Sequence, residues 1–326
     1  MSDSPADRYR EARQRASHPG VRAFAESLPF TLDDFQTEAC RAVEDGRSVL
    51  VAAPTGAGKT VVGEFAVRCA KERGEKAFYT TPIKALSNQK FRDLTEAYGP
   101  SAVGLLTGDT SINGNADIVV MTTEVLRNMI YAGSPTLERL GVVILDEVHY
   151  LADRFRGSVW EEILVHLDPG TEIVALSATV SNTEEFGAWL KEVRGDTEVI
   201  VSEIRPIPLW QHVMLREGLF DLYAPGVDPT EPGQSPRLNP DLEAVIRRLR
   251  HPPRHRGPRG VGRRPPPRFA VIDVLDSQGL LPAIIFVFSR AGCDDAVDQI
   301  RSAGMGLTTD AERALIAAIV EERCSG

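Results

Sequence analysis

Short apolar runs alternate with longer amphipathic segments between residue 30 and about residue 215. The apolar runs cover residues 48–52, 76–79, 103–106, 117–121, 142–145, 172–176 and 198–201. Each run is bounded by turn residues or followed by a segment with helical periodicity, such as residues 60–73 and 83–97. Strands separated by helices over this length predict a parallel α/β sheet with helices on both faces.

The pattern changes after residue 215, because a Pro/Gly/acidic segment is followed by the tract HPPRHRGPRGVGRRPPPR. Such a tract cannot bury a core and predicts a mobile linker or insertion. Further on, the pattern predicts a helix, a strand and a helix over residues 270–277, 283–288 and 292–301. The expected organisation is a polar lead-in (1–25), an α/β domain (26–215), a linker or insertion (216–268) and the truncated start of a second sheet domain (269–326).

Composition narrows the class of protein. The 326 residues are 42% hydrophobic and 25% charged, as in ordinary globular proteins. The net charge of −9 argues against a protein that coats nucleic acid by bulk attraction, but it is compatible with a local basic groove that binds a strand. The four cysteines are scattered, which disfavours a zinc site or a disulfide framework. Without an apolar leader or an apolar run of about 20 residues, we expect a cytoplasmic protein with no membrane partner.

A phosphate-binding loop is the main chemical signal. Residues 53–60 read APTGAGKT, directly after one apolar run and directly before an amphipathic segment. Small residues let backbone N–H groups surround a phosphate, and the following helix presents its positive end. Lys59 would reach the β- and γ-phosphates, and the Thr60 hydroxyl would ligate Mg²⁺. The residues expected to contact the nucleotide are Pro54, Thr55, Gly56, Ala57, Gly58, Lys59 and Thr60.

Two carboxylates, Asp146 and Glu147, follow the apolar run 142–145. Parallel sheets place their ligands at the carboxyl ends of strands. Asp146 would hold Mg²⁺ through its water shell, and Glu147 would polarise the water that attacks the γ-phosphate. Adjacent acids can also be helix-capping residues, but the phosphate loop upstream favours the catalytic interpretation. The chain is therefore predicted to bind a nucleoside triphosphate with Mg²⁺.

Several motifs resemble those of superfamily 2 helicases and occur in the same order. They are FTLDDFQ at 30–36 (Q motif), TPIKALSNQ at 81–89 (Ia), TTEVLR at 122–127 (Ib), DEVH at 146–149, SAT at 177–179 (III) and LPAIIFVFSRAGCD at 281–294 (IV). Residues 155–162 and 205–209 resemble the Ski/Mtr-like branch, and within it the closest likeness is to the actinobacterial HelY-type helicases. The resemblance implies a RecA-like first domain, the opening of a second one, and ATP and Mg²⁺ as cofactors.

The resemblance also implies roles for individual residues. Phe30 and Gln36 would pack against and hydrogen-bond adenine, although Gln36 alone could be a capping residue. His149 would link the γ-phosphate site to Ser177 and Thr179, or would otherwise be a satisfied histidine at a strand end. The residues expected to contact a nucleic-acid strand are Thr81, Pro82, Lys84, Thr107, Gly108, Thr122 and Thr123.

Three functions remain open. The first is an ATP-dependent helicase on single-stranded RNA that moves 3′ to 5′, with RNA-degradation proteins as candidate partners. The second is a DNA repair helicase, and the third is a nucleotide-dependent binding fragment that unwinds nothing. No segment after Arg290 resembles motifs V and VI, whose arginines accelerate phosphoryl transfer by roughly 10³- to 10⁵-fold in related enzymes. We therefore expect weak ATP hydrolysis from the isolated chain.

Overall fold

The computed structural model describes residues 17–149, 157–178, 183–227, 236–250, 265–306 and 308–324. The chain divides into two compact units, Met1–Pro208 and Leu209–Gly326. None of the helices within the described ranges is long and apolar enough to cross a membrane.

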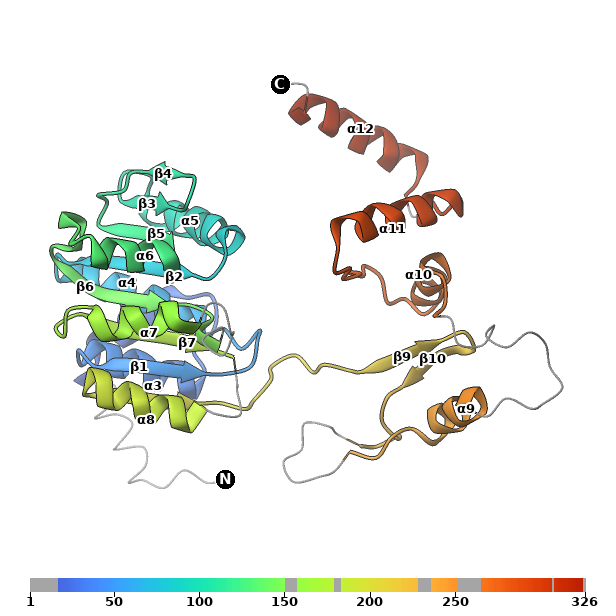
Figure 1. Ribbon diagram of the computed structural model, residues 1–326, viewed down its shortest axis with the longest axis horizontal. Coiled ribbons are helices and arrows are strands. Elements are labelled where there is room, and N and C mark those ends of the chain that lie inside the picture. Colours follow the sequence, from blue (N-terminus) through green and yellow to red (C-terminus); the bar gives the residue numbers. More distant parts are fainter. Residues whose placement is uncertain are drawn as a thin grey trace. The chain divides into compact units, whose positions relative to one another are not determined.

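Unit 1 is built on an eight-stranded sheet with the strand order β4-β3-β5-β2-β6-β7-β1-β8 (Figure 1). The strands are β1 (Ser48–Ala52), β2 (Lys76–Thr81), β3 (Val103–Leu106), β4 (Ser111–Ile112), β5 (Ile118–Thr122), β6 (Leu140–Leu145), β7 (Glu172–Ser177) and β8 (Thr197–Val201). All pairs are parallel except β3 with β4, which are antiparallel. The predicted α/β fold is confirmed, and only the two-residue β4 has no counterpart among the predicted runs.

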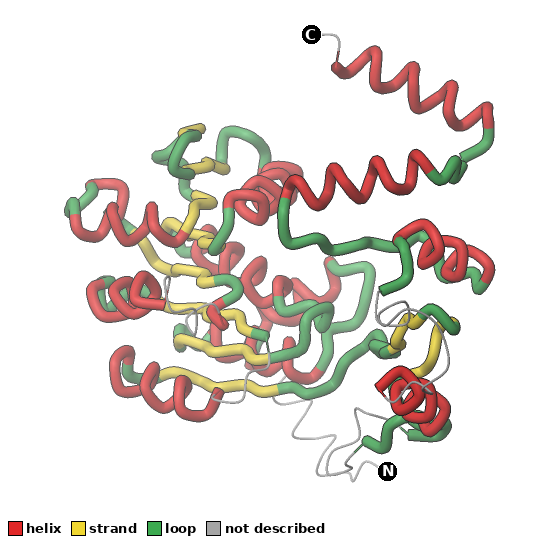
Figure 2. Tube along the Cα trace, turned by 45° about the vertical axis from the view of Figure 1, so that its right-hand side comes forward, coloured by secondary structure: helices red, strands yellow, loops and turns green. Residues whose placement is uncertain are grey.

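Helices cover both faces of this sheet (Figure 2). They are α2 (Pro19–Ser27), α3 (Asp34–Glu44), α4 (Thr60–Glu72), α5 (Lys84–Tyr98), α6 (Thr123–Tyr131), the 3₁₀ helix η1 (Pro135–Leu137), α7 (Gly157–His166) and α8 (Thr183–Arg194). Side chains alternate along β6, so Val142 and Ile144 join the core beneath α3 and α4, whereas Val143 and Leu145 join the core beneath α6 and α7. Burial on both faces explains why the central strands read as continuous apolar runs.

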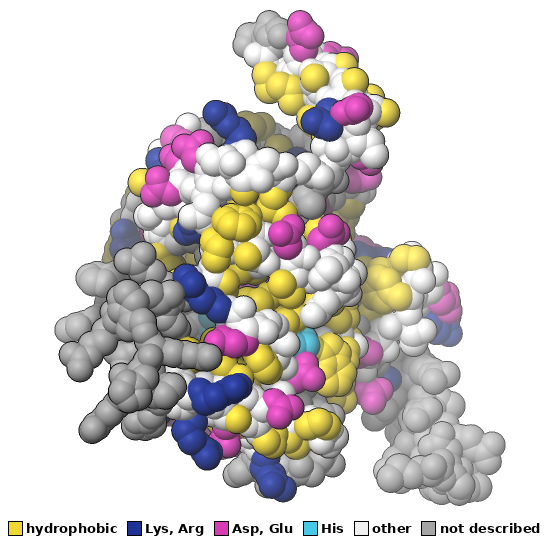
Figure 3. All heavy atoms as spheres, turned by 90° about the vertical axis from the view of Figure 1, so that its right-hand side faces the viewer, with side chains coloured by type: hydrophobic (Ala, Val, Ile, Leu, Met, Phe, Trp, Pro, Cys, Tyr) yellow, Lys and Arg dark blue, Asp and Glu magenta, His cyan; other side chains and the backbone are white. Residues whose placement is uncertain are grey.

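Unit 2 contains a hairpin and four helices within its described residues. They are β9 (His212–Leu215), β10 (Gly218–Asp221), α9 (Pro240–Arg250), α10 (Arg268–Ser277), α11 (Arg290–Ser302) and α12 (Asp310–Cys324). The antiparallel hairpin lies across residue 215, where the alternation of apolar runs and helical segments ends. Leu315 and Val320 of α12 are exposed to solvent. Figure 3 shows apolar side chains at the surface in yellow.

The strand predicted for residues 283–288 is wrong. This segment pairs with no described strand, and the Phe286 side chain is 85% exposed. An apolar run becomes a strand only where a neighbouring strand takes its backbone hydrogen bonds and another layer covers its side chains. The helices predicted on either side of it are confirmed as α10 and α11.

Close contact between β3 and the turn after β4 leads to a testable prediction. A Cβ atom at Gly104 would lie 2.2 Å from the backbone carbonyl oxygen of Asn113, so even a methyl group requires the backbone to move. We expect Gly104→Ala to lower the free energy of unfolding by about 1–3 kcal/mol, the usual cost of overpacking. Urea unfolding followed by circular dichroism measures this change.

Gly108→Ala is the matched control, because a Cβ atom there meets nothing within 4 Å. We expect its unfolding free energy to stay within about 0.5 kcal/mol of the wild type. Equal unfolding midpoints for the two variants would show that the contact at Gly104 does not limit stability.

Candidate functional site

The predicted nucleotide-binding residues converge at one edge of the sheet in unit 1. β1, β7 and β6 are adjacent and parallel, so their carboxyl ends lie side by side. The phosphate loop follows β1, Ser177 ends β7, and the pair Asp146 and Glu147 follows β6. The sheet thus brings together three motifs that are far apart in the sequence.

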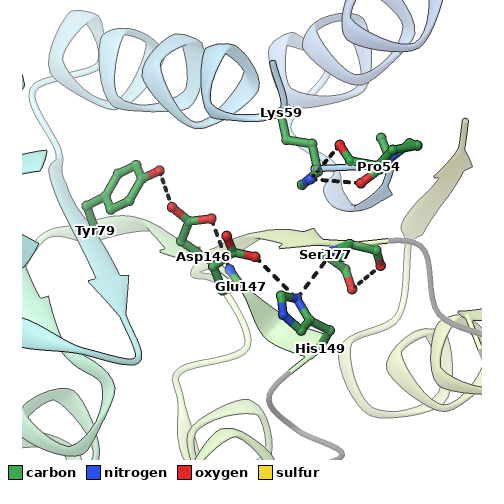
Figure 4. A network of polar contacts seen from close by, with 9 residues as sticks. Pro54, Lys59, Tyr79, Asp146, Glu147, His149 and Ser177 are labelled. Atoms are coloured by element: carbon green, nitrogen blue, oxygen red, sulfur yellow. Dashed lines mark hydrogen bonds and ion pairs between the residues drawn. The ribbon is translucent and has the colours of Figure 1, made fainter. Parts of the chain in front are cut away.

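The phosphate loop has a backbone that requires glycine. Gly56 and Gly58 have φ angles of 88° and 78°, in the left-handed region that other residues rarely adopt. The Lys59 ammonium donates hydrogen bonds to the carbonyl oxygens of Ala53 (2.7 Å) and Pro54 (3.1 Å), as Figure 4 shows. A phosphate that binds in this loop would compete with these carbonyl groups for Lys59. Burial is the main cause that lowers the pKa of Lys59, and the nearby carboxylates oppose this effect.

Gln36 connects α3 to the phosphate loop. Its Oε1 accepts a hydrogen bond from the backbone N–H of Asp33 (2.9 Å), and its Nε2 donates to the carbonyl oxygens of Ala57 (3.2 Å) and Gly58 (3.1 Å). The side chain is 4% exposed, and both ends of its amide bind the protein. Contact with adenine would therefore require Gln36 to exchange one of these bonds. Phe30, the other residue expected at adenine, is half-exposed.

Asp146 is held from three directions. Its backbone N–H donates to the carbonyl oxygen of Thr80 at 3.0 Å. Its Oδ2 accepts a hydrogen bond from the Tyr79 hydroxyl, and its Oδ1 accepts one from the backbone N–H of Glu147, both at 2.9 Å. Burial raises the pKa of Asp146, and the hydrogen bond from Tyr79 acts in the opposite direction. The carboxylate orientation is therefore fixed while each oxygen keeps a lone pair for a further ligand.

Glu147 and His149 follow Asp146 in the chain and contact each other. Glu147 has a φ of 56°, a strained conformation that is typical of functional positions. Its Oε2 lies 3.2 Å from Nδ1 of His149, and the backbone N–H of Ala178 points to the same Nδ1 at 3.3 Å (Figure 4). Without a proton, Nδ1 accepts a hydrogen bond from the backbone N–H of Ala178, whereas with a proton it donates to the Glu147 carboxylate. Through Nδ1, His149 can therefore bind Ala178 or Glu147, but not both at once.

The expected link from His149 to motif III is described only in part. Ser177 is buried, and its hydroxyl donates to the carbonyl oxygen of Ala178 at 2.8 Å. The backbone carbonyl of Ser177 accepts a hydrogen bond from Ala53 in the phosphate loop at 3.1 Å. Thr179 lies outside the described residues.

The oxygen donors of this edge suit Mg²⁺. Thr60 begins α4 at the end of the phosphate loop, and Asp146 lies at the end of β6. Mg²⁺ prefers oxygen ligands and is usually bound through one or two carboxylates together with substrate phosphates and water. A hydroxyl group, a fixed carboxylate and a phosphate-binding loop at one edge fit that preference.

The second half of the same edge carries the residues expected at nucleic acid. β3, β5 and β2 are adjacent and parallel. Thr107 follows β3, and Thr122 and Thr81 are the last residues of β5 and β2. Thr81 itself is buried, and its hydroxyl is 2.7 Å from the Ser87 hydroxyl. Thr123 is also buried and donates to the Thr81 carbonyl oxygen at 3.2 Å. These two threonine side chains therefore stabilise the chain at the ends of β2 and β5 through buried hydrogen bonds.

Lys84 and Asp109 lie on the exposed surface of this half. The Lys84 ammonium contacts both carboxylate oxygens of Asp109, at 2.6 and 2.8 Å. The Thr107 hydroxyl also donates to Asp109, at 3.0 Å. The hydrogen bond from Lys84 is the main cause that lowers the pKa of Asp109. Asp109 thus competes with a nucleic-acid phosphate for the Lys84 ammonium. Of the other residues expected to contact the strand, Gly108 is exposed and Pro82 is buried.

Two residues at the site carried no functional assignment from sequence. Tyr79 donates to Asp146, and the Arg205 guanidinium donates to the carbonyl oxygen of Thr55 in the phosphate loop at 3.3 Å. Tyr79 is paired in register with Ile144, two residues before Asp146. Only the register of β2 against β6 reveals this contact, and a single sequence does not contain that register.

Comparisons with known proteins identify helicases as relatives of this chain. Residues 33–186 match the model of the DEAD/DEAH box helicases. The "Probable helicase HelY" of Mycobacterium tuberculosis is 57% identical over 309 residues, which are 92% of this chain and 34% of that protein. HelY of Mycobacterium leprae is 56% identical over 318 residues, and the "Exosome RNA helicase MTR4" of Homo sapiens is 36% identical over 301 residues. These matches cover 92% and 91% of this chain, and 34% and 28% of the respective relatives. The chain therefore spans about a third of the length of these relatives.

The geometry of the phosphate loop yields a second prediction. A Cβ atom at Gly58 would lie 2.7 Å from Nε2 of Gln36, at a φ that also strains any other residue. We expect Gly58→Ala to displace the loop from Gln36 and weaken nucleotide binding at least roughly ten-fold, because backbone N–H groups must approach the phosphates closely. Titration with a fluorescent ATP analogue measures this affinity.

Gly74→Ala is the control, since Gly74 has a φ of 70° but a Cβ atom there meets nothing within 4 Å. It carries the same type of backbone strain far from the loop and should retain wild-type nucleotide affinity. An affinity loss of similar size in both variants would mean that lost stability, and not the loop geometry, causes the effect.

Proposed function

The chain belongs to the DEAD/DEAH box helicases through residues 33–186, and on that premise we propose that unit 1 is an ATP-driven motor domain that acts on a nucleic-acid strand. The observation that carries this proposal is the convergence of Lys59, Asp146 and Glu147 at the carboxyl ends of β1 and β6. A nucleotide-binding loop and two oriented carboxylates are the parts that ATP hydrolysis requires.

Each residue would perform a distinct step. Lys59 would exchange its two carbonyl partners for the β- and γ-phosphates. Thr60 and Asp146 would hold Mg²⁺, which when bound neutralises phosphate charge. Glu147 would orient the attacking water and accept its proton, while His149 beside it would connect the site to the strand end at Ser177. Gln36 and Phe30 would contact the adenine base.

The exposed half of the sheet edge would bind a single strand of nucleic acid. Lys84, Gly108 and Thr122 would contact successive phosphates, and the buried Thr81 and Thr123 would support the loops that carry them. Phosphate contacts of this kind position a strand without reading its sequence. They also do not distinguish RNA from DNA.

We favour RNA as the substrate because similar proteins are described as RNA helicases. We favour 3′-to-5′ movement because residues 155–162 and 205–209 resemble the Ski/Mtr-like branch. A role on DNA, and a role as a nucleotide-dependent binding fragment, remain the alternatives. We also propose that unit 2 contributes the start of a second RecA-like domain, with motif IV at residues 281–294, and that RNA-degradation proteins are partners in the cytoplasm.

Hydrolysis at this site is tested by Glu147→Gln. The substitution keeps the shape of the side chain but removes the base, and loss of a general base typically costs about 10²- to 10⁴-fold in rate. We expect phosphate release to fall by that amount, while binding of a fluorescent ATP analogue persists. Stimulation of wild-type hydrolysis by oligouridylate but not by oligodeoxythymidylate would identify the 2′-hydroxyl as a recognised group.

Glu72→Gln is the control, because Glu72 ends α4, the helix that begins at the phosphate loop, and pairs with Arg68 on the surface. It should hydrolyse ATP at the wild-type rate. If Glu147→Gln also retains that rate, the measured hydrolysis does not arise from this site.

The contact between Lys84 and Asp109 gives a prediction for strand binding. We expect Asp109→Asn to release Lys84 for a phosphate and to strengthen binding of oligouridylate by about two- to five-fold at low salt, the range expected for an exposed ion pair. Because one more phosphate contact forms, affinity should also fall more steeply with salt concentration. Fluorescence anisotropy at several salt concentrations measures both effects.

Asp117→Asn is matched in charge, because Asp117 also pairs with an arginine on the surface, Arg139, but precedes β5 at the opposite edge of the sheet. It should leave strand affinity close to the wild-type value. Equal gains in the two variants would indicate a general effect of net charge.

A further inference from the structure

Tyr79 is a buried polar group whose contact lies at the proposed metal site. Its side chain is fully buried within β2, and its hydroxyl donates to Oδ2 of Asp146 at 2.9 Å. The second carboxylate oxygen is held by the backbone N–H of Glu147. Tyr79 therefore provides the side-chain contact that sets the rotation of this carboxylate, as Figure 4 shows.

The ring of Tyr79 is confined by the helix that follows the phosphate loop. A Cβ atom at Gly63 on α4 would lie 3.2 Å from Cε2 of Tyr79 and 3.1 Å from Cγ2 of Ile144. Glycine at this position lets α4 approach β2 closely. The position of the hydroxyl therefore depends on how α4 and β2 pack.

Lys90 connects the same ring to α5. Its ammonium lies 5.4 Å from the centroid of the Tyr79 ring, a cation–π distance. It also lies 3.1 Å from Oε1 of Glu64 on α4 and 3.6 Å from Oδ2 of Asp93 on α5. Lys90 is 9% exposed, but Glu64 and Asp93 are partly exposed, so water partly screens these two ion pairs. The first residue of α5 is Lys84, which we expect to contact the strand.

We propose that Tyr79 is a positioning residue for the metal-binding carboxylate Asp146, and that Lys90 couples Tyr79 to α5, so that a bound strand changes the affinity of the site for Mg²⁺. This inference rests on the proposed function and adds to it a physical route between its two halves. A shift of α5 on strand binding moves Lys90 against the face of the ring, and the ring carries the hydroxyl that orients Asp146.

The first test replaces the hydroxyl alone, in the 326-residue chain. Tyr79→Phe keeps the ring and its packing, so the chain should still fold, with a lower melting temperature because one buried hydrogen bond is lost. Loss of a hydrogen bond to a metal ligand from its outer shell typically weakens metal affinity by roughly 10- to 100-fold. We expect the Mg²⁺ concentration for half-maximal binding of a fluorescent ATP analogue to rise by that factor. Binding of the analogue in excess EDTA should be unchanged.

Tyr98→Phe is the matched control. Tyr98 packs against the same hydrophobic core as Tyr79, and the Lys71 ammonium lies 4.8 Å from its ring centroid. The hydroxyl that binds Asp146 belongs to Tyr79 and not to Tyr98. This variant should require the wild-type Mg²⁺ concentration. Gly63→Ala, which presses on the Tyr79 ring, should shift the requirement in the same direction as Tyr79→Phe.

The second test addresses the coupling. In the wild type, saturating oligouridylate should lower the Mg²⁺ concentration for half-maximal nucleotide binding. Lys90→Met, which keeps the chain length and removes the charge, should abolish most of this strand-dependent shift. Lys71→Met removes the equivalent cation beside Tyr98 and should keep the shift.

The outcomes separate this inference from the proposed function. A wild type whose nucleotide binding ignores Mg²⁺ would contradict the proposed ATP site itself. If the wild type responds to Mg²⁺ and folded Tyr79→Phe and Gly63→Ala chains respond identically, the positioning role is overturned. If the strand causes no shift in the wild type, or causes the same shift in Lys90→Met, the coupling is overturned.

Discussion

The parallel pairing of β6 with β2 and β7 is the constraint on which the functional edge depends. This pairing continues one residue past β6, because the backbone N–H of Asp146 donates to the Thr80 carbonyl oxygen on β2. The same strand supplies the Tyr79 hydroxyl to the Asp146 side chain. On the other side, β7 pairs with both β6 and β1, and therefore fixes the distance between the carboxylates and the phosphate loop. Any change of register in these strands would separate the groups that must act together.

The strand order divides one edge of the sheet into two halves with different surroundings. Behind the phosphate loop, polar groups are buried and hydrogen-bonded, as Gln36 and Lys59 show. At the carboxyl ends of β2 and β3, the charged groups of Lys84 and Asp109 face solvent. Buried contacts keep fixed geometry because the loss of a partner is costly there, whereas exposed ion pairs exchange partners easily. The half at the phosphate loop is thus suited to holding reacting groups in fixed positions, and the exposed half is suited to a ligand whose contacts exchange.

The fold was predictable because burial on both faces of a parallel sheet leaves a direct trace in the sequence. Seven apolar runs became strands, and helices formed between them. The run at 283–288 has the same composition but did not become a strand, since a strand also depends on a neighbour that local sequence does not describe. Burial of Thr81 was missed for a related reason: the residue follows an apolar run, and only the packing of α5 and α6 around it decides that its hydroxyl turns inward.

The sequence alone determined that this chain has a phosphate-binding loop, two adjacent carboxylates and a parallel sheet, because each depends on residues that are close together in the chain. The tertiary structure decided which partners those residues have. Tyr79 meets Asp146 across 67 positions, and Gln36 meets the loop at Gly58 across 22. Such contacts depend on strand order and register, which long-range packing sets and local patterns do not encode. The loop that holds a phosphate is therefore visible in the sequence, whereas the hydroxyl that orients the carboxylate beside it is visible only in the folded sheet.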